Sequence, residues 1–327
     1  MSKKLILHIG ANKTGSSAIQ RFLTMNNLAL RAEGITVPDN EFRVADQIQG
    51  FHVFGFQRLL KSPLEGRKQL EDAIDAAYTA YPGATATLLS AENLAANPAA
   101  PSLFENLVKR YDTEVIIYIR RQDEFILSSW QQWHSKSSTD FWAWVISAIG
   151  KLGNWRACLE NWETVLPRDK ITVRIFERSK LEGGDVIADF YSMLGISKPL
   201  SDLAYPKRTV NPSFSDAIVD LVKGNELVFR NVHDNEFYNF VLDMTGDKYT
   251  KPARQSPITF AQRQAILGRY KQHNDWVKKA YFPHTEGELF SPPRACDYDH
   301  VPPEDADQQK LEFLTTVLYQ MYKRGMG

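Results

Sequence analysis

The first thirty residues of this 327-residue chain place an apolar run, a glycine-containing loop and an amphipathic stretch in direct succession. Residues 5–9 form the apolar run, and residues 10–17 carry two glycines, a lysine and three hydroxyl side chains. Residues 18–30 have apolar side chains at helical spacing. This order predicts a strand, a loop and a helix, and such a loop points backbone N–H groups and the positive end of a helix dipole at an anion. We therefore expect the chain to begin with a phosphate-binding site.

The position of the lysine in this loop argues against a nucleoside triphosphate as the ligand. The triphosphate loop needs a Lys followed by Ser or Thr directly after its second glycine. Gly10 and Gly15 have the required separation, but Ser16 stands where that lysine would be. The lysine of this loop is Lys13, which precedes Thr14. The loop can still neutralise a terminal anion, but it lacks the residue pair that serves a triphosphate and Mg²⁺.

Composition indicates a soluble globular protein whose anion site must be local. Hydrophobic residues make up 43% and charged residues 24%, and the formal net charge is zero. No global field therefore favours nucleic acid or an anionic membrane as a partner. The two cysteines suit a reducing compartment, and no apolar run has the length of a signal peptide or a spanning helix. These features predict a cytoplasmic protein without an integral membrane segment.

Strand and helix patterns alternate through the first two thirds of the chain. Further strands are predicted at residues 34–38, 84–90, 114–119 and 170–175, and helices at residues 64–81, 102–111, 141–165 and 186–194. This alternation predicts an α/β fold with a parallel, doubly wound sheet. From about residue 199 the strand signals fade, and helices are expected at residues 214–229, 259–281 and 307–323. Residues 39–63 have the pattern of a long irregular loop rich in aromatics, and such loops are often functional.

A second candidate site follows the strand at residues 114–119. Arg120 comes directly after this strand, and Ser128 lies eight residues further on, in the next predicted helix. Open parallel sheets bind ligands at the carboxyl ends of their strands. An Arg fork and a Ser hydroxyl are suitable donors for one phosphate group. Arg121 and Ser129 have the same spacing, so either pair could bind the phosphate. We favour Arg120 because it directly follows the strand.

These motifs together resemble the sulfotransferases that use 3′-phosphoadenosine 5′-phosphosulfate. Residues 8–20 read H-I-G-A-N-K-T-G-S-S-A-I-Q, which is similar to the 5′-phosphosulfate loop of bacterial members, and Arg120 and Ser128 match the pair that binds the 3′-phosphate. The resemblance implies a P-loop-like fold in a single domain over residues 1–327. Within it, residues 1–198 form the α/β core and residues 199–327 a mostly helical cap that completes the site. It implies donor binding by Lys13, Thr14, Gly15, Ser16, Ser17, Arg120, Ser128 and, in a late basic loop, Arg208.

The resemblance also implies a general base near the same rim of the sheet. Sulfuryl transfer needs the acceptor hydroxyl to lose its proton as it attacks sulfur, and family members place a His or a Glu near this rim. Glu92 follows the third predicted strand and is our candidate base. His52, in the aromatic loop, is the rival, because that loop could fold over the acceptor. His8 lies inside the first strand and is expected to be a buried, hydrogen-bonded residue.

The sequence therefore predicts an enzyme that moves a sulfuryl group from 3′-phosphoadenosine 5′-phosphosulfate to a hydroxyl acceptor without a metal, with Lys13 also serving catalysis. The product would be adenosine 3′,5′-bisphosphate, and a glycan, a glycolipid and a small molecule all remain open as acceptor. Two alternatives stand beside it. A P-loop-like small-molecule kinase is disfavoured by the missing Gly-Lys-Ser/Thr run. A non-catalytic binder of the bisphosphate nucleotide or of a carbohydrate would have no need of Glu92.

Overall fold

The chain forms two compact units. The computed structural model describes residues 3–48, 51–137, 140–206, 214–250, 255–300 and 303–325. The first unit comprises Met1–Arg120, Asn154–Thr209 and His273–Phe290, and the second comprises Arg121–Gly153, Val210–Gln272 and Ser291–Gly327. Residues 121–153 thus belong to the same unit as much of the C-terminal third. The predicted division at residue 198 remains a prediction.

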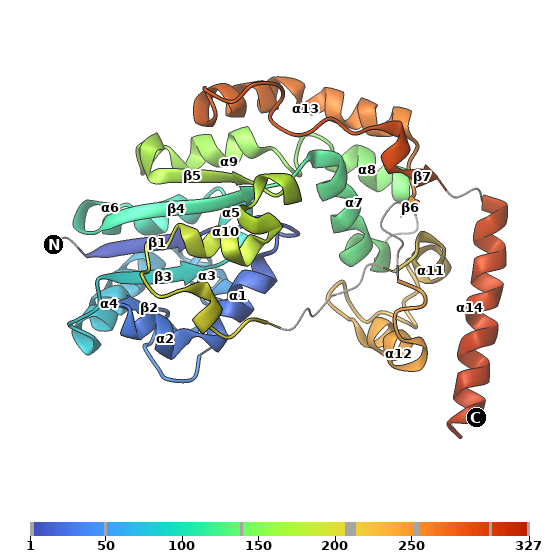
Figure 1. Cartoon of the computed structure of the whole chain (residues 1–327), viewed down its shortest axis with the longest axis horizontal. Helices are drawn as coiled ribbons and strands as arrows, with labels where there is room; N and C mark the ends of the chain where they lie inside the picture. Colours follow the sequence, from blue (N-terminus) through green and yellow to red (C-terminus); the bar gives the residue numbers. More distant parts are fainter. Residues whose placement is uncertain are drawn as a thin grey trace. The chain divides into compact units, whose positions relative to one another are not determined.

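A five-stranded parallel sheet forms the centre of the first unit (Figure 1). Its strands are β1 (Lys4–His8), β2 (Ile35–Thr36), β3 (Ala86–Ser90), β4 (Asp112–Ile119) and β5 (Ile171–Ile175), in the order β2-β3-β1-β4-β5. The central strand β1 pairs with β3 and β4, so that His8 lies between Ser90 and Ile116. Because all pairings are parallel, the loops after β1, β3 and β4 leave the sheet at the same edge.

Helices cover both faces of this sheet, which confirms the predicted doubly wound α/β fold. On one face, α1 (Ser16–Met25) and α10 (Val186–Ser192) bury Phe22 and Phe190 against side chains of β1, β3 and β4. On the other, Tyr78 of α4 (Pro63–Ala80) donates a hydrogen bond to the Lys4 carbonyl. The remaining helical elements are α2 (Asn27–Ala32), α3 (Val53–Leu59), α5 (Asn93–Ala96), η1 (Ala100–Phe104), α6 (Leu107–Arg110), α9 (Trp155–Trp162), η3 (Arg168–Lys170), η4 (Arg178–Lys180), η5 (Glu182–Gly184) and η6 (Leu200–Asp202).

The second unit is mainly helical. It contains α7 (Gln122–Gln132), η2 (His134–Lys136), α8 (Phe141–Ala148), α11 (Asp216–Val222), α12 (Glu236–Thr245), η7 (Ala295–Asp297), α14 (Pro303–Lys323) and a two-residue strand pair, β6 (Gln255–Ser256) with β7 (Asp299–His300). The helix α13 (Phe260–Tyr281) begins in this unit and ends in the first. Phe214 and Val241 pack with Phe313 and Val317 of α14 in one apolar cluster. None of the described helices is both long and apolar enough to cross a bilayer.

Two predicted helices are broken by short polar or glycine-containing segments. The helix predicted at residues 18–30 is divided at Asn26, whose side-chain amide bonds to the carbonyls of Phe22 and Ala204 at 2.9 and 2.8 Å. The helix predicted at residues 141–165 is interrupted by Gly150 and Gly153, which both have positive φ. Asn154 then begins α9 by accepting a hydrogen bond from the Ala157 N–H. Both breaks follow from local side-chain and glycine chemistry.

Other element predictions need smaller corrections. The prediction that residues 39–63 are irregular throughout is wrong, because α3 lies within them. The helix predicted at residues 102–111 is replaced by η1 and α6, and the one at residues 214–229 is limited to α11, which Gly224 follows with a positive φ. The helix α12 was not predicted. Helices do form at both of the later predicted positions, as α13 and α14.

A buried carboxylate stabilises the face of the sheet that α10 covers. Asp189 is fully buried and accepts hydrogen bonds from Tyr118 Oη at 2.7 Å, Arg174 Nε at 2.9 Å and the Glu182 N–H at 2.9 Å. Burial alone would disfavour its charge, but the bonds from Arg174 and its other partners hold the pKa of Asp189 below its ordinary value. This network joins β4, β5 and α10 beside the β1–α1 loop.

Asp189→Ala should lower the free energy of unfolding by about 3 kcal/mol, because it leaves Arg174 and the Tyr118 hydroxyl without their buried acceptor. Urea unfolding at neutral pH measures this change. Asp202→Ala is the matched control, since this carboxylate is exposed, and it should change stability by less than about 0.5 kcal/mol. Equal, small effects of the two substitutions would contradict the structural role of Asp189.

Candidate anion-binding site at the sheet edge

The loop between β1 and α1 is a tight turn whose shape depends on Gly15. Gly15 has φ +86°, and a Cβ there would lie 2.9 Å from Val186 Cγ1 and 3.0 Å from Phe176 Cε2. The side chains of Thr14 and Ser16 both donate to the Ala11 carbonyl, at 2.6 and 3.1 Å. The first N–H groups of α1, including those of Ser16 and Ser17, have no acceptor within the helix because no turn precedes them. The loop therefore presents backbone donors at a helix N-terminus, as predicted for an anion site.

Lys13 lies within this loop in a conformation that non-glycine residues rarely adopt. Its φ is +64°, in the left-handed region. Burial and the neighbouring charge of Arg120 lower the pKa of Lys13 from 10.5 to about 8. Arg120 Nη1 donates a hydrogen bond to the Lys13 carbonyl at 3.1 Å. A strained backbone and two adjacent cations raise the energy of the ligand-free loop, and a bound anion would offset the repulsion between the charges.

Glu92 lies at the same edge of the sheet. The Ala91 N–H donates to the His8 carbonyl at 3.0 Å, so the chain after β3 stays beside the end of β1. Gln20 of α1 donates its side-chain amide to Glu92 Oε2 at 2.6 Å. Three of the predicted residues, Lys13, Glu92 and Arg120, therefore meet at one edge of the first unit. Gln20 was not among the predicted site residues, although it belongs to the I-Q pair that ends the N-terminal motif.

His52 is placed differently from the prediction that its loop folds over an acceptor. It is fully buried, stacked on Phe42 with 5.7 Å between ring centroids. Its Nδ1 accepts from the Ser90 N–H at 3.0 Å, and its Nε2 lies 2.9 Å from the Pro38 carbonyl. Burial lowers the pKa of His52 to about 4, although the contact with the Pro38 carbonyl opposes that shift. With both ring nitrogens bonded to the backbone, His52 fits a structural role, and Glu92 is the base that we carry forward.

His8 is a buried residue that connects the ends of strands β1 and β3 at this edge. Its ring is fully buried, and Nδ1 lies 2.8 Å from Ser90 Oγ. Burial lowers the pKa of His8 to about 3, so the ring is neutral at physiological pH. This arrangement matches the expectation of a hydrogen-bonded histidine inside the first strand.

The contacts of Arg121 favour Arg120 and Ser128, rather than Arg121 and Ser129, as the predicted phosphate-binding pair. Arg121 Nε donates to Asp123 Oδ1 at 2.7 Å, and its Nη1 donates to the Ser291 carbonyl at 2.9 Å. Asp123 is fully buried and also pairs with the buried Arg263. Arg121 is thus part of the scaffold of the second unit. Ser129 is buried at 2% exposure, whereas Ser128 is half-buried.

The donor-binding roles of all the predicted residues stay predictions, including those of Ser128 and Arg208. Ser128 lies on α7 in the second unit, and its joint role with Arg120 is a prediction from the sequence. Arg208 lies outside the described residues, as do the neighbouring Asn211 and Ser213 of the predicted basic loop.

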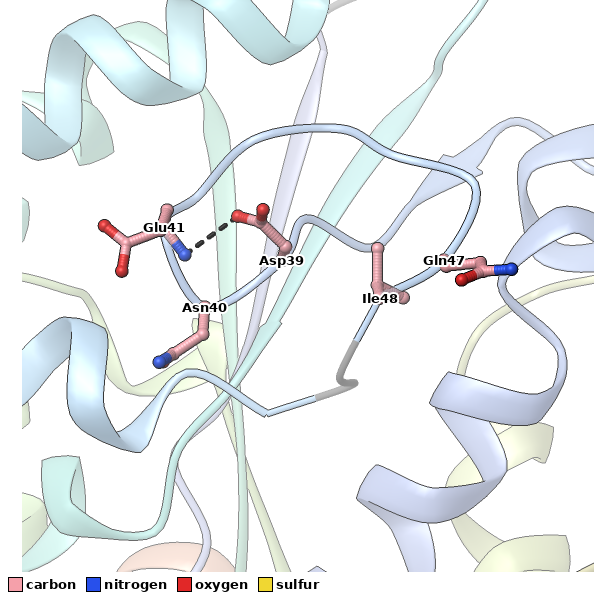
Figure 2. A pocket seen from close by; sticks show the side chains of 5 residues that line it. All are labelled: Asp39, Asn40, Glu41, Gln47 and Ile48. Carbon is pink, nitrogen blue, oxygen red and sulfur yellow. Dashed lines mark hydrogen bonds between the residues drawn. The ribbon is translucent and has the colours of Figure 1, made fainter.

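A cavity of about 330 Å³ follows β2 at the carboxyl edge of the sheet. It is lined by Asp39, Asn40, Glu41, Gln47 and Ile48 (Figure 2). Asp39 Oδ1 accepts hydrogen bonds from the N–H groups of Glu41 and Arg43, both at 2.8 Å, which fixes the turn. Four of its five lining residues have polar side chains. The contact of His52 with Pro38 and Ser90 connects this turn to the end of β3.

A parallel sheet with a helix N-terminus and a lysine loop after its central strand defines an α/β protein with a P-loop-like fold. Residues 3–280 match the family model described as the sulfotransferase domain. The chain therefore belongs to the sulfotransferase family.

Individual relatives are more distant. A protein of Archaeoglobus fulgidus, described as uncharacterized, is 26% identical over 176 residues, which make up 52% of this chain and 46% of that protein. The chain thus spans about half the length of this relative. A crystal structure of a sulfotransferase from Alicyclobacillus acidocaldarius is 17% identical with a TM-score of 0.41, and the match covers 64% of this chain and 87% of that one. A sulfotransferase domain from the curacin biosynthetic pathway is 12% identical with a TM-score of 0.34, covering 82% of this chain and 96% of that one.

Lys13→Met should raise the free energy of unfolding of the ligand-free protein by about 1 kcal/mol at neutral pH, because it removes a desolvated charge beside Arg120. The direction of this change in the free energy of unfolding follows from the lowered pKa of Lys13. The charged ammonium of Lys13 destabilises the folded state by its full amount below about pH 8. This destabilisation shrinks as the pH rises toward 10.5 and is absent above that value.

Urea unfolding of both proteins across this pH range tests the expectation. The advantage of Lys13→Met should decline between pH 8 and 10.5. Lys61→Met, at an exposed lysine, is the control and should show no such trend. An advantage that stayed constant with pH would show that the gain does not come from the charge of Lys13.

Proposed function

We propose that this protein transfers a sulfuryl group from 3′-phosphoadenosine 5′-phosphosulfate to a hydroxyl group of an acceptor. The observation that carries the proposal is the pairing of Lys13 with Arg120 beside the N-terminus of α1, at the sheet edge that also holds Glu92. Membership of the sulfotransferase family supports the reaction class.

The residues of the β1–α1 loop fit the phosphosulfate part of this donor. Gly15 has no Cβ, so the backbone of the turn stays close to the helix end. The ammonium group of Lys13 and the N–H groups of residues 14–17 would hold the 5′-phosphosulfate, whose bound form supplies an activated sulfuryl group on a phosphate leaving group. Arg120 would contact the 3′-phosphate, and this second anion distinguishes the donor from ADP and ATP. Ser128 is the predicted hydroxyl partner of Arg120 on that phosphate.

Glu92 would act as the general base of the transfer. Its carboxylate takes the proton of the acceptor hydroxyl as the hydroxyl oxygen attacks sulfur. The new oxygen–sulfur bond forms while the bond from sulfur to the bridging phosphate oxygen breaks, and that oxygen keeps the electron pair. Lys13 and the backbone donors stabilise the charge that grows on the phosphate. Gln20, bonded to Glu92 Oε2 at 2.6 Å, would orient the carboxylate toward the acceptor.

The cavity after β2 is our candidate for the acceptor side. Its carboxylate and amide groups, those of Asp39, Asn40, Glu41 and Gln47, can hydrogen-bond to hydroxyl groups. Such hydrogen bonds would suit a hydroxyl-rich acceptor, such as a glycan or the head of a glycolipid.

Two alternatives of the sequence analysis are weaker on these observations. A non-catalytic binder of the bisphosphate nucleotide has no need of a carboxylate held by Gln20 at the anion site. A small-molecule kinase would need the lysine at the position that Ser16 occupies.

Glu92→Gln should retain binding of adenosine 3′,5′-bisphosphate and lower sulfuryl transfer by about 10²–10⁴-fold, because the amide cannot accept the hydroxyl proton. The measurement follows radiolabelled sulfur from the donor onto a panel of hydroxyl acceptors, with calorimetric titration of the bisphosphate alongside. Glu33→Gln is the matched control, because Glu33 lies near the opposite edge of the sheet, next to β2.

Unchanged transfer by Glu92→Gln would refute the role of Glu92 as base. A wild-type protein that bound the bisphosphate but sulfated none of the acceptors would favour the non-catalytic binder.

A further inference from the structure

The side chain of His52, the residue before α3, joins the ends of two strands at the carboxyl edge of the sheet. The β2–β3 ladder ends at the pair Thr36 and Thr87. Beyond that pair, His52 Nδ1 accepts from the Ser90 N–H at 3.0 Å, and Nε2 lies 2.9 Å from the Pro38 carbonyl oxygen. A proline has no N–H with which to continue a ladder. The His52 ring therefore supplies a connection between the two chains that the ladder cannot.

These contacts determine which ring nitrogen of His52 carries the proton. Burial lowers the pKa of the ring, so that it is neutral at physiological pH. Because Nδ1 accepts, the proton is on Nε2, which donates to the Pro38 carbonyl. The other tautomer would place two acceptors, Nε2 and the carbonyl oxygen, 2.9 Å apart. Phe42 stacks on the ring and Phe56 packs edge-on against it, with 5.7 and 6.4 Å between ring centroids. His52 is thus held in one orientation, with a different partner for each nitrogen.

His52 and the first turn of α3 hold the chain on both sides of Glu92. Two residues before Glu92, the Ser90 carbonyl accepts from the His52 N–H at 2.8 Å, so that both backbone groups of Ser90 bond to His52. Directly after Glu92, the side-chain amide of Asn93 donates to the Val53 carbonyl at 3.0 Å. The base segment, which we define as residues 90–93, is therefore fixed to the beginning of α3.

The same helix holds the turn that lines the cavity after β2. The Gly55 N–H donates to Asn40 Oδ1 at 2.9 Å, and a Cβ on Gly55 would lie 2.6 Å from the Asn40 carbonyl oxygen. This close contact requires a glycine. Arg58 pairs with Glu41 at 2.8 Å. Because Asn40 and Glu41 line the cavity, α3 connects the cavity wall with the base segment.

We propose that His52 is a positioning residue of sulfuryl transfer, which together with the first turn of α3 fixes Glu92 relative to the cavity wall. The inference rests on the proposed function, since it takes Glu92 as the base and the cavity as the acceptor side. The bond of Nδ1 to Ser90 then determines the placement of the base, and the bond of Nε2 to Pro38 determines the placement of the wall that the acceptor contacts. A misplacement of about 1 Å can reduce a rate by about 10²-fold. Loss of one bond should therefore impair one side of the reaction only.

Two substitutions separate the two bonds. His52→Asn places an amide oxygen near the position of Nδ1, which keeps an acceptor for the Ser90 N–H and removes the donor to Pro38. His52→Gln places an amide N–H near the position of Nε2, which keeps that donor and removes the acceptor. Phe56→Leu is the matched control, because it alters the packing around the same ring and leaves both bonds in place. Circular dichroism verifies that each variant is folded.

Hydrogen–deuterium exchange of the full chain without ligand tests the bonds themselves. His52→Gln should raise the exchange rate of residues 86–96 by about tenfold, because the loss of one buried hydrogen bond favours local opening by about that factor. His52→Asn should raise the exchange rate of residues 36–44 instead, and Phe56→Leu should affect both segments alike. Similar rises in both segments for the two His52 variants, or no rise in either, would overturn the proposal.

Steady-state kinetics with the best acceptor of the hydroxyl panel test the role in the reaction. His52→Gln should lower kcat by about tenfold with an unchanged KM for the acceptor, whereas His52→Asn should raise that KM by about tenfold with an unchanged kcat. Both variants should bind adenosine 3′,5′-bisphosphate as the wild type does. Asn93→Ala removes the other bond of the base segment and should also lower kcat alone, which keeps the proposal testable if a His52 variant does not fold.

The failure of this inference can be told apart from that of the proposed function. A wild type that transfers sulfuryl groups, with kcat and KM changing together in both His52 variants, would overturn the inference alone. A wild type without transfer would overturn the proposed function as well.

Discussion

The site depends on two cations, Lys13 and Arg120, that are held close together after the adjacent strands β1 and β4. Lys13 and Arg120 come from loops that leave adjacent parallel strands, and a hydrogen bond joins the Arg120 guanidinium to the Lys13 carbonyl. The same neighbourhood lowers the pKa of Lys13 to about 8 and holds its backbone in the left-handed region. The rest of the fold offsets these costs, and the anion that we propose as ligand would offset the repulsion between the two side chains.

The sheet explains why these residues meet. The register that places His8 between Ser90 and Ile116 also places the ends of β1, β3 and β4 side by side. Lys13, Glu92 and Arg120 then follow within a few residues of their strands. The buried side chains at this edge, His8 and His52, bond to Ser90 and keep the chain after β3 in position. Neutral, buried histidines suit this role because they form hydrogen bonds without adding charge beside two cations.

Much of this could be predicted from the sequence, because strands and turns are specified locally. The apolar runs before Gly10, Glu92 and Arg120 identify three strand ends, and parallel pairing brings them together. The role of His52 could not be predicted, because its partners Pro38 and Ser90 are distant in the sequence and its burial depends on tertiary packing. Gln20 is a similar case: its bond to Glu92 crosses 72 residues, and only the short I-Q pair of the N-terminal motif pointed to it. The sequence favoured Arg120 over Arg121 because Arg120 directly follows the strand, and the contacts of Arg121 with Asp123 and Ser291 add an argument that only the fold provides.

The most direct test of the account is calorimetric titration of the purified protein with adenosine 3′,5′-bisphosphate and, separately, with ADP, both without added metal. The two ligands have the same number of phosphates, and they differ in whether the second lies on the 3′-oxygen or extends the 5′-phosphate. The account predicts tight binding of the 3′,5′-bisphosphate and much weaker binding of ADP, because Lys13 and Arg120 would contact separate phosphates. Equal affinity for the two ligands, or no binding of either, would contradict it.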